Sequence, residues 1–122
     1  PWTATEFAAL LSQPYVRAFG DPCCFALVQI LPPEAELLTI ATLPTYQRQG
    51  RARTVMSAWQ TAAREGGAER AFLDVAADNS PAIALYEACG YETCGRRKGY
   101  YRRENAESVD AIVMQRDLSV RT

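Results

Sequence analysis

The 122-residue sequence contains no histidine. This absence excludes serine–histidine and cysteine–histidine catalytic pairs, histidine-ligated metals and a histidine general base. Acid–base chemistry must therefore come from carboxylates, tyrosine, lysine or cysteine. Long hydrophobic runs are also missing, since no apolar run approaches the roughly 20 residues of a membrane-spanning helix. We therefore expect no membrane association.

The cysteines form neither a C-x-x-C pair nor a zinc-binding pattern. They are Cys23, Cys24, Cys89 and Cys94. We therefore predict no metal site, and we expect buried, reduced thiols in a cytoplasmic protein. An excess of charge of one sign is absent as well, because 13 basic and 14 acidic residues give a net charge of -1. This balance offers no general argument for a nucleic-acid partner.

Length and composition predict a single domain covering residues 1–122, with 48% hydrophobic and 22% charged residues. The chain starts at Pro1 rather than methionine, and we expect it to be part of a somewhat longer protein. Apolar runs and turn residues predict an α/β (α+β) fold, a mixed twisted sheet flanked by helices. The predicted helices are 3–11, 51–65 and 79–89; the predicted strands are 15–19, 23–31, 36–43, 71–75, 91–101 and 111–117; turns are expected at 20–22 and 32–34.

The segment 46–53, YQRQGRAR, lies between a predicted strand and the start of a predicted helix. Gly50 lets the backbone turn sharply and approach a ligand, and Ala52 keeps the next turn small. Free N–H groups and the positive end of the helix dipole suit a phosphate or pyrophosphate. A simple turn followed by solvated arginines fits the same pattern, so the anion site needs a matching context. The arginines that add charge here are Arg48, Arg51 and Arg53.

Two side chains beyond this segment are candidates for chemistry. Asp74 lies in the apolar strand 71–75, where burying a carboxylate is costly without a purpose or a partner. An aspartate that caps a neighbouring backbone, or one that faces water at an edge, fits equally well. Tyr86 lies in the helix 79–89 at the spacing of its apolar neighbours, so it also fits a core tyrosine. Both would reach a ligand crevice at the carboxyl ends of the strands.

Two more features have both a structural and a functional interpretation. Asn79, ahead of Pro81, is typical of a helix N-cap, and a cap that faces the crevice can also touch a ligand. A basic stretch interleaved with Tyr100 and Tyr101 fits a nucleic-acid patch or a solvated hairpin. The acidic residues that follow it favour the hairpin. The basic residues are Arg96, Arg97, Lys98, Arg102 and Arg103, and the acidic ones are Glu104, Glu107 and Asp110.

Residues 47–52, QRQGRA, match the Q/R-x-x-G-x-G/A pyrophosphate loop of the GNAT superfamily, and the chain resembles these acetyl-CoA-dependent N-acetyltransferases over nearly its whole length. The segments LLTIATLP, FLDVAADNSPAIALYEACGY, RRKGYY and DAIVM, with Pro1-Trp2-Thr3, resemble the bacterial enzymes that acetylate the N-terminal alanine of a small-subunit ribosomal protein. The resemblance implies the GNAT fold, with its first strand and part of its first helix missing here.

The resemblance also implies roles for individual residues. Asp74 falls at the position of the base, and Tyr86 at that of the acid that protonates the leaving thiolate, with direct attack and no acyl-enzyme. Asn79 would contact the co-substrate. Backbone groups of three strand residues would pair with the pantetheine arm and polarise the acetyl carbonyl: Ile40, Ala41 and Thr42. The pyrophosphate would be held by Arg48, Gln49, Gly50, Arg51, Ala52 and Arg53.

One departure from the family leaves the base open. The ribosomal-protein enzymes have glutamate where this chain has Asp74, so the carboxylate is one methylene shorter. Either an extra or shifted water is needed, or Asp74 is not the base. The resemblance implies a protein N-terminus as acceptor, in the first place a ribosomal protein beginning with alanine. The chemistry agrees, because an α-amine with a pKa of about 7.7 to 8.0 needs less help than lysine at about 10.4. The alternatives are a small amine acceptor and a non-catalytic CoA- or RNA-binding module.

Overall fold

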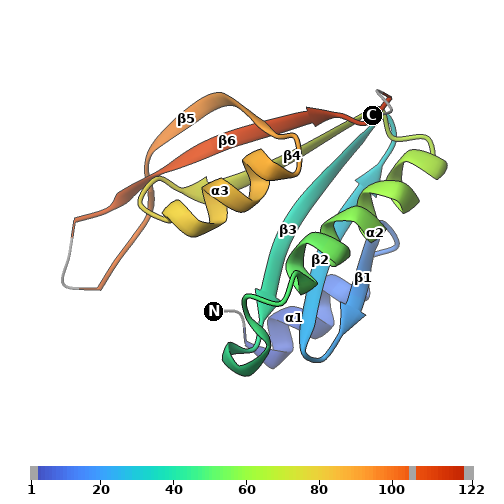
Figure 1. The fold of residues 1–122 in the computed structure, drawn as a ribbon, viewed down its shortest axis with the longest axis horizontal. Helices are drawn as coiled ribbons and strands as arrows, with labels where there is room; N and C mark the ends of the chain where they lie inside the picture. The colour runs from blue at the N-terminus through green and yellow to red at the C-terminus, as the bar shows by residue number, and fades with distance from the viewer. Residues whose placement is uncertain (1–2, 105–106, 120–122) are drawn as a thin grey trace.

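The computed structural model describes residues 3–104 and 107–119, so that Pro1 and Trp2 of the resembled N-terminal segment lie outside the described residues. Six strands form one sheet in the order β1-β2-β3-β4-β6-β5. The order of helices and strands along the chain is the predicted one (Figure 1). The elements are α1 (Ala4–Leu11), β1 (Val16–Asp21), β2 (Cys24–Leu31), β3 (Glu34–Thr42), the 3-10 turn η1 (Pro44–Tyr46), α2 (Arg51–Glu65), β4 (Arg70–Ala76), α3 (Ser80–Ala88), β5 (Glu92–Tyr101) and β6 (Val109–Asp117).

Helices α2 and α3 cover one face of the sheet, and α1 lies against β1 on the other (Figure 1). Helix α2 places apolar side chains at helical spacing towards the strands, which buries them in the core. Met56 and Trp59 are completely buried there, and the Trp59 indole N–H donates to the Met56 sulfur at 3.2 Å. Packing in the core between the helices and the sheet therefore fixes the position and the direction of α2.

The pairing of β3 with β4 is parallel and short. It runs from Glu34 opposite Arg70 to Leu37 opposite Leu73, and α2 provides the crossover between the two strands. A bulge at Leu38 interrupts the pairing of β3 with β2 at the same level. Bulges bend a strand and increase its local twist. Beyond Leu37 and Leu73 the two strands diverge (Figure 1).

The predicted turn at residues 20–22 is wrong by two residues, because β1 continues to Asp21. Gly20 has a φ of 102°, and a Cβ there would collide with the Cys24 carbonyl oxygen, so glycine permits this close strand pairing. Asp21 then accepts hydrogen bonds from the N–H groups of Cys23 and Cys24 at 2.8 and 3.1 Å. The carboxylate closes a two-residue turn between β1 and β2.

All four cysteines are free thiols. Cys24 is buried and Cys23 and Cys89 are partly buried, but Cys94 is exposed, so the prediction of buried thiols is wrong for Cys94. It lies on β5, which is an edge strand of the sheet. Within residues 3–104 and 107–119, no helix is long and apolar enough to cross a membrane.

Candidate active site

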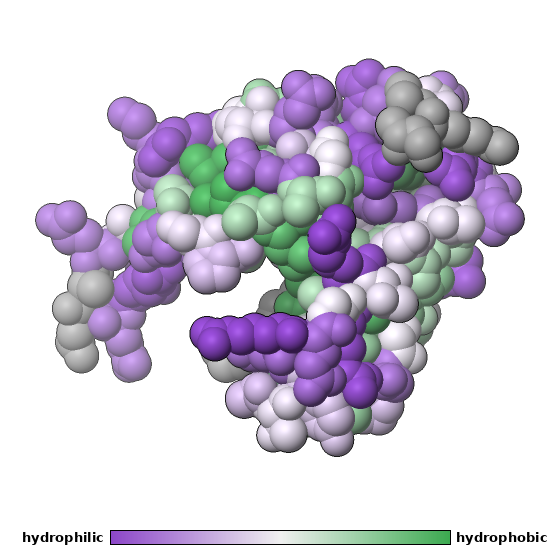
Figure 2. All heavy atoms as spheres, in the orientation of Figure 1, coloured by the Kyte–Doolittle hydropathy of each residue, from purple (hydrophilic) through white to green (hydrophobic). Residues whose placement is uncertain are grey.

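A cleft opens where β3 and β4 diverge. It consists of two adjoining hollows of about 540 Å³ each, which share Ile40, Asn79, Ala82 and Tyr86. We call both together the central cleft, with a loop half beside residues 46–53 and a strand half between β3 and β4. Figure 2 shows the surface deeply hollowed between the part of the molecule that carries α3 and the part that carries the start of α2. All the predicted site residues except Gln49 thus line this one cleft.

Gly50 forms the turn of the loop half. It is the N-cap of α2 with a φ of 76°, and a Cβ built there would meet nothing within 4 Å. Arg48 is also left-handed, with a φ of 63°. The first N–H groups of any helix lack a partner within the helix, and no side chain caps those of α2. The positive end of the helix dipole faces the loop. This arrangement has the features of an anion-binding site.

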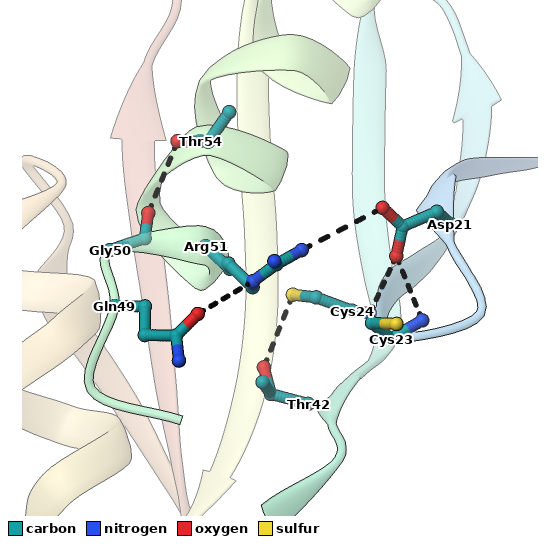
Figure 3. Close-up of polar contacts among 8 residues, drawn as sticks. All are labelled: Asp21, Cys23, Cys24, Thr42, Gln49, Gly50, Arg51 and Thr54. Atoms are coloured by element: carbon teal, nitrogen blue, oxygen red, sulfur yellow. Dashed lines mark hydrogen bonds and ion pairs between the residues drawn. The ribbon is translucent and has the colours of Figure 1, made fainter. Parts of the chain in front are cut away.

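The side chain of Arg51 braces the loop. Its Nε donates to Gln49 Oε1 at 3.1 Å, its guanidinium lies over the Tyr46 ring at 4.7 Å, and its terminal nitrogen is 3.9 Å from Asp21. Figure 3 shows this arginine lying between Gln49 and the β1–β2 hairpin. Thr54 Oγ1 adds a hydrogen bond to the Gly50 carbonyl at 3.1 Å. The Arg51 guanidinium is therefore engaged within the protein, whereas its backbone N–H stays at the helix N-terminus.

The strand half exposes a backbone edge of β3. Ile40, Ala41 and Thr42 pair with β2 on one side, but β4 pairing has ended at Leu37. Alternate backbone groups of a strand point to opposite edges. Those that point away from β2 consequently face the cleft, where a ligand chain can pair with them. This is where the resemblance expects the pantetheine arm.

Tyr86 and Asn79 on the α3 side line both hollows. Tyr86 is buried, and its burial, with smaller effects of Tyr101 and Cys89, raises its pKa to about 12. The hydroxyl is therefore protonated at neutral pH and available as a donor. Asn79 Oδ1 accepts from the Ala82 N–H at 3.3 Å, which confirms the predicted cap. Both residues thus have a structural role and face the cleft.

Asp74 has a charged partner. Its side chain is 18% exposed, and Arg97 Nε donates to its Oδ1 at 3.3 Å. It lines the strand half together with Tyr86 and Tyr101. Burial, followed by the charges of Asp74 and Tyr100, raises the pKa of Tyr101. From the sequence, Tyr101 was predicted only as part of the basic hairpin, because the pairing of β5 with β6 is what carries it to Asp74.

A third hollow of about 280 Å³ adjoins the cleft at Asp74. It is lined by Gln29, Leu31, Glu34, Ala35, Glu36, Phe72, Leu73, Asp74, Arg97 and Val113, and we call it the back pocket. Burial, then the Asp74 charge, raises the pKa of Glu36, and Arg97 opposes the shift. Glu36 was not among the predicted site residues, although a carboxylate between Ala35 and Leu37 in a strand was the available signal. Perturbed carboxylates beside a cleft are candidates for function.

The basic hairpin is largely neutralised by aspartates. Arg96 pairs with Asp110 at 2.7 Å, and Arg97 with Asp74. Arg103 makes two hydrogen bonds of 2.9 Å to Asp78. These pairs support the solvated-hairpin interpretation of the basic stretch, with the aspartates as partners.

Comparison with known proteins places this site in a family. The acetyltransferase (GNAT) family model matches residues 8–91. The chain is 33% identical to the [ribosomal protein bS18]-alanine N-acetyltransferase of Escherichia coli K12, over 98% of this chain and 83% of that protein. It is 34% identical to the N-alpha-acetyltransferase RimI of Mycobacterium tuberculosis, over 96% of this chain and 76% of that protein.

A solved structure agrees with these sequence matches. The crystal structure of the ribosomal-protein-S18-alanine N-acetyltransferase from Escherichia coli superposes with a TM-score of 0.87 at 31% identity. The match covers 100% of this chain and 81% of that one, which confirms the predicted mixed sheet flanked by helices as the GNAT fold. The chain therefore belongs to the GNAT family and is an acetyl-CoA-dependent N-acetyltransferase.

Proposed function

We propose that this enzyme acetylates the α-amino group of a protein N-terminus, and that a small-subunit ribosomal protein beginning with alanine is its first candidate acceptor. The observation that carries the proposal is the identity of 33% over 98% of the chain to a ribosomal-protein-alanine acetyltransferase. A second relative, 34% identical, is also named for acetylation of α-amines. Their shared acceptor chemistry is an unblocked protein N-terminus.

The central cleft suits acetyl-CoA as the donor. The backbone N–H groups of residues 48–53, at an uncapped helix N-terminus with open space over Gly50, would hold the pyrophosphate. The free edge of Ile40, Ala41 and Thr42 would pair with the pantetheine arm. Asn79 would contact the donor from the other wall. Acetyl-CoA supplies a thioester whose acyl carbon is open to attack.

The transfer step is direct. The amine nitrogen forms a bond to the acyl carbon as its proton passes to a carboxylate, and the carbon–sulfur bond breaks. Backbone N–H groups of β3 polarise the acyl oxygen. Tyr86, whose pKa is raised to about 12 and whose hydroxyl is protonated at neutral pH, donates its hydroxyl hydrogen to the departing thiolate. Asp74 holds the position of the base, with Arg97 fixing its orientation.

The proton transfer does not require a strong base. The α-amine has a pKa of about 7.7 to 8.0 and is partly neutral near pH 7.5. Asp74 has a short side chain that is 18% exposed, so a water can carry the proton between amine and carboxylate. This route accounts for aspartate at a position where the relatives resembled in sequence have glutamate.

We also propose that residues 1–122 act as one acetyltransferase domain in the cytoplasm, where a ribosomal acceptor is made. Nucleic acid is not part of the proposal. Three of the five basic residues at positions 96–103 are paired with aspartates. The acceptor is therefore reached as a polypeptide.

The test is mass spectrometry of acceptors incubated with the protein and acetyl-CoA. The set contains peptides starting with Ala, Ser or Met, the same peptides with a blocked N-terminus, and spermidine. We expect acetylation of the unblocked Ala peptide at its α-amine and none of its blocked counterpart. Acetylation of spermidine alone would make the enzyme a small-amine acetyltransferase. Binding of acetyl-CoA without any acetylated product would make it a non-catalytic module.

A further inference from the structure

A fourth hollow lies outside the central cleft and the back pocket. It has a volume of about 460 Å³ and is enclosed by α2, the end of α3, the start of β5 and the end of β6. We call it the side pocket. Its polar walls come from α2 and the two strands and consist of Arg53, Ser57, Gln60, Glu92, Arg116 and Asp117.

The α2 wall of the side pocket contains a buried polar group without a partner. Arg53, Ser57 and Gln60 are spaced by four and three residues, so they lie on one face of the helix. Gln60 is 5% exposed, and its side-chain oxygen is buried with no hydrogen-bond partner among the described residues. Such a group costs stability. The terminal amide can turn about its last bond, so a donor group of a ligand in the pocket would satisfy it.

The charged groups of the side pocket are not paired with one another. Arg53, Arg116 and Glu92 line it, yet none of the three makes a salt bridge with a described residue. Asp117 is held by Ser119, whose backbone N–H and hydroxyl donate to its Oδ1 at 2.9 and 2.6 Å. Unpaired charges of both signs around one hollow leave room for a ligand between them.

Arg116 is held in place at the pocket wall. Its Nη1 donates to the Cys89 carbonyl oxygen at 2.8 Å. A Cβ built at Gly90 would lie 3.2 Å from Arg116 Nε, so the missing side chain lets the guanidinium lie close to the backbone there. A guanidinium carries five N–H donors, so Arg116 keeps donors for an anionic group. A donor that is already oriented loses less entropy when a ligand binds.

The balance of charge indicates the class of ligand. Two guanidinium groups and two carboxylates line the side pocket, so its charges cancel. A phosphate would be repelled by Glu92 and Asp117 while it is attracted by the arginines. A small zwitterion matches both signs, because its carboxylate pairs with a guanidinium and its ammonium donates to carboxylates and to the Gln60 oxygen. A free α-amino acid is the simplest ligand with this chemistry.

Arg53 connects the side pocket with the donor site. It lines both the side pocket and the loop half of the central cleft. In the proposed function the pyrophosphate of acetyl-CoA lies at this loop. A carboxylate bound to Arg53 from the side pocket neutralises a charge that favours the pyrophosphate. Coupling between two binding sites is reciprocal, so each ligand weakens the binding of the other.

We propose that the side pocket is a second binding site, specific for a free α-amino acid, and that its occupation weakens the binding of acetyl-CoA through Arg53. Arg53 and Arg116 bind the carboxylate of the amino acid. Glu92, Asp117 and Gln60 bind its ammonium group. The site goes beyond the proposed function, because it involves neither the acceptor nor acetyl transfer. Binding can therefore be measured on the enzyme alone.

The test is calorimetric titration of the enzyme with the standard amino acids, one at a time. Each amino acid that binds is compared with its N-acetyl derivative, which lacks the ammonium group, and with its amide, which lacks the carboxylate. ADP and inorganic phosphate are titrated as anions without an ammonium group. The Kd of acetyl-CoA is then measured with and without a saturating amount of the amino acid.

Three variants separate the side pocket from the surrounding surface. Glu92→Gln and Arg116→Gln each remove one charge from the pocket. Glu87→Gln is the matched control, because Glu87 is an exposed carboxylate near the end of α3 and is not among the residues that line the pocket. Thermal unfolding reports whether each variant is folded. Glu92 is exposed at the start of β5, so its variant is expected to fold even if Arg116→Gln does not.

We expect at least one amino acid to bind, and neither of its derivatives. Glu92→Gln and Arg116→Gln should each weaken its binding by about tenfold, and Glu87→Gln should bind it as the wild type does. A saturating amount should raise the Kd of acetyl-CoA by about fivefold.

Several results would overturn the proposal. One is that no amino acid binds, and another is that Glu92→Gln binds the amino acid as tightly as the wild type. Binding of ADP that acetyl-CoA displaces and Glu92→Gln strengthens would assign the pocket to the nucleotide end of the donor. An unchanged Kd of acetyl-CoA would overturn the coupling through Arg53. Failure of the proposed function appears separately, as a lack of acetylated product, which none of these titrations measures.

Discussion

The loop half of the central cleft and the back pocket are built in opposite ways. The loop half is lined mainly by one stretch of chain, residues 40–53, with its helix N-terminus and arginines, and residues 79–86 close it from the α3 side. The back pocket consists of side chains from five strands, and its charged groups are mostly carboxylates. A phosphate and an ammonium group need opposite electrostatics. The two regions approach each other at Asp74, which lines both the back pocket and the strand half of the central cleft.

In the proposed function the loop half recognises the donor alone, so acceptor recognition falls to other parts of the molecule. Backbone N–H groups bind a pyrophosphate whatever the acceptor is. The same loop can therefore serve enzymes with different acceptors. The back pocket depends on which side chains the strands present. Substitutions in the loop half should therefore change donor binding, and substitutions elsewhere should change acceptor chemistry. Only residues that line both halves of the central cleft should change the acetyl-transfer step itself.

The largest effect is expected at Tyr86, which lies between the halves. Tyr86→Phe removes the donor to the thiolate and should lower kcat by about 100-fold with little change in the Kd of acetyl-CoA. Tyr91→Phe is the matched control, since Tyr91 is equally buried, packs edge-on at 6.2 Å and has a hydroxyl without a partner among the described residues. Its kcat and stability should be unchanged or slightly improved. Equal losses in both variants would assign Tyr86 to packing.

The next effect concerns the loop half alone. Gly50→Ala puts a side chain at a φ of 76°, which costs about 1–2 kcal/mol and adds a methyl group where the pyrophosphate is proposed to approach. We expect the Kd of acetyl-CoA to rise by about tenfold, measured by calorimetry. Gly67→Ala, at a φ of 102° beyond the far end of α2, carries a similar strain and should lower stability without changing this Kd. Weaker donor binding in both variants would argue against a local role of the loop.

A smaller effect is expected at Arg97, the β5 residue that lines the back pocket, compared with its neighbour Arg96. Arg97 lowers the pKa of Glu36 by favouring its charged form, so Arg97→Gln should raise that pKa further. The Glu36 carboxyl then stays protonated to a higher pH, which an NMR titration of its side chain measures. Arg96→Gln, which breaks the neighbouring pair with Asp110, should leave the pKa of Glu36 in place. An unmoved pKa of Glu36 in Arg97→Gln would contradict the coupling.

The smallest effect is structural. Arg96, followed by the Gly99 N–H, lowers the pKa of Asp110 below its ordinary value of 3.8. A lowered folded pKa adds stability above the ordinary pKa, and this stability is lost as the pH falls through the folded value. Asp110→Asn should therefore melt slightly below wild type at pH 7. The difference should vanish in strong acid, and acetyl-CoA binding should be the same throughout. A difference that persisted at low pH would require another cause.

Much of the donor side could be predicted from the sequence, because its signals are local. Gly50 before a helix, Asn79 with Pro81, and Gly66 with Gly67 set turns and caps through the conformations that single residues permit. Apolar periodicity predicted α2 and the two central strands for the same reason. Asp74 and Tyr86 were placed at the crevice by the order of strands and helices. Their proposed roles still depend on experiment.

The back pocket was decided by the tertiary structure. Glu36, Asp74 and Arg97 are separated by dozens of residues and meet only through the register of β3, β4, β6 and β5. The engagement of Arg51 with Asp21 likewise required the β1–β2 hairpin to fold beside α2. Steric limits and hydrogen bonds act over a few residues, so the sequence by itself determined the loop, the caps and the order of elements. Which distant side chains share a pocket depends on strand pairing, and only the folded sheet fixes it.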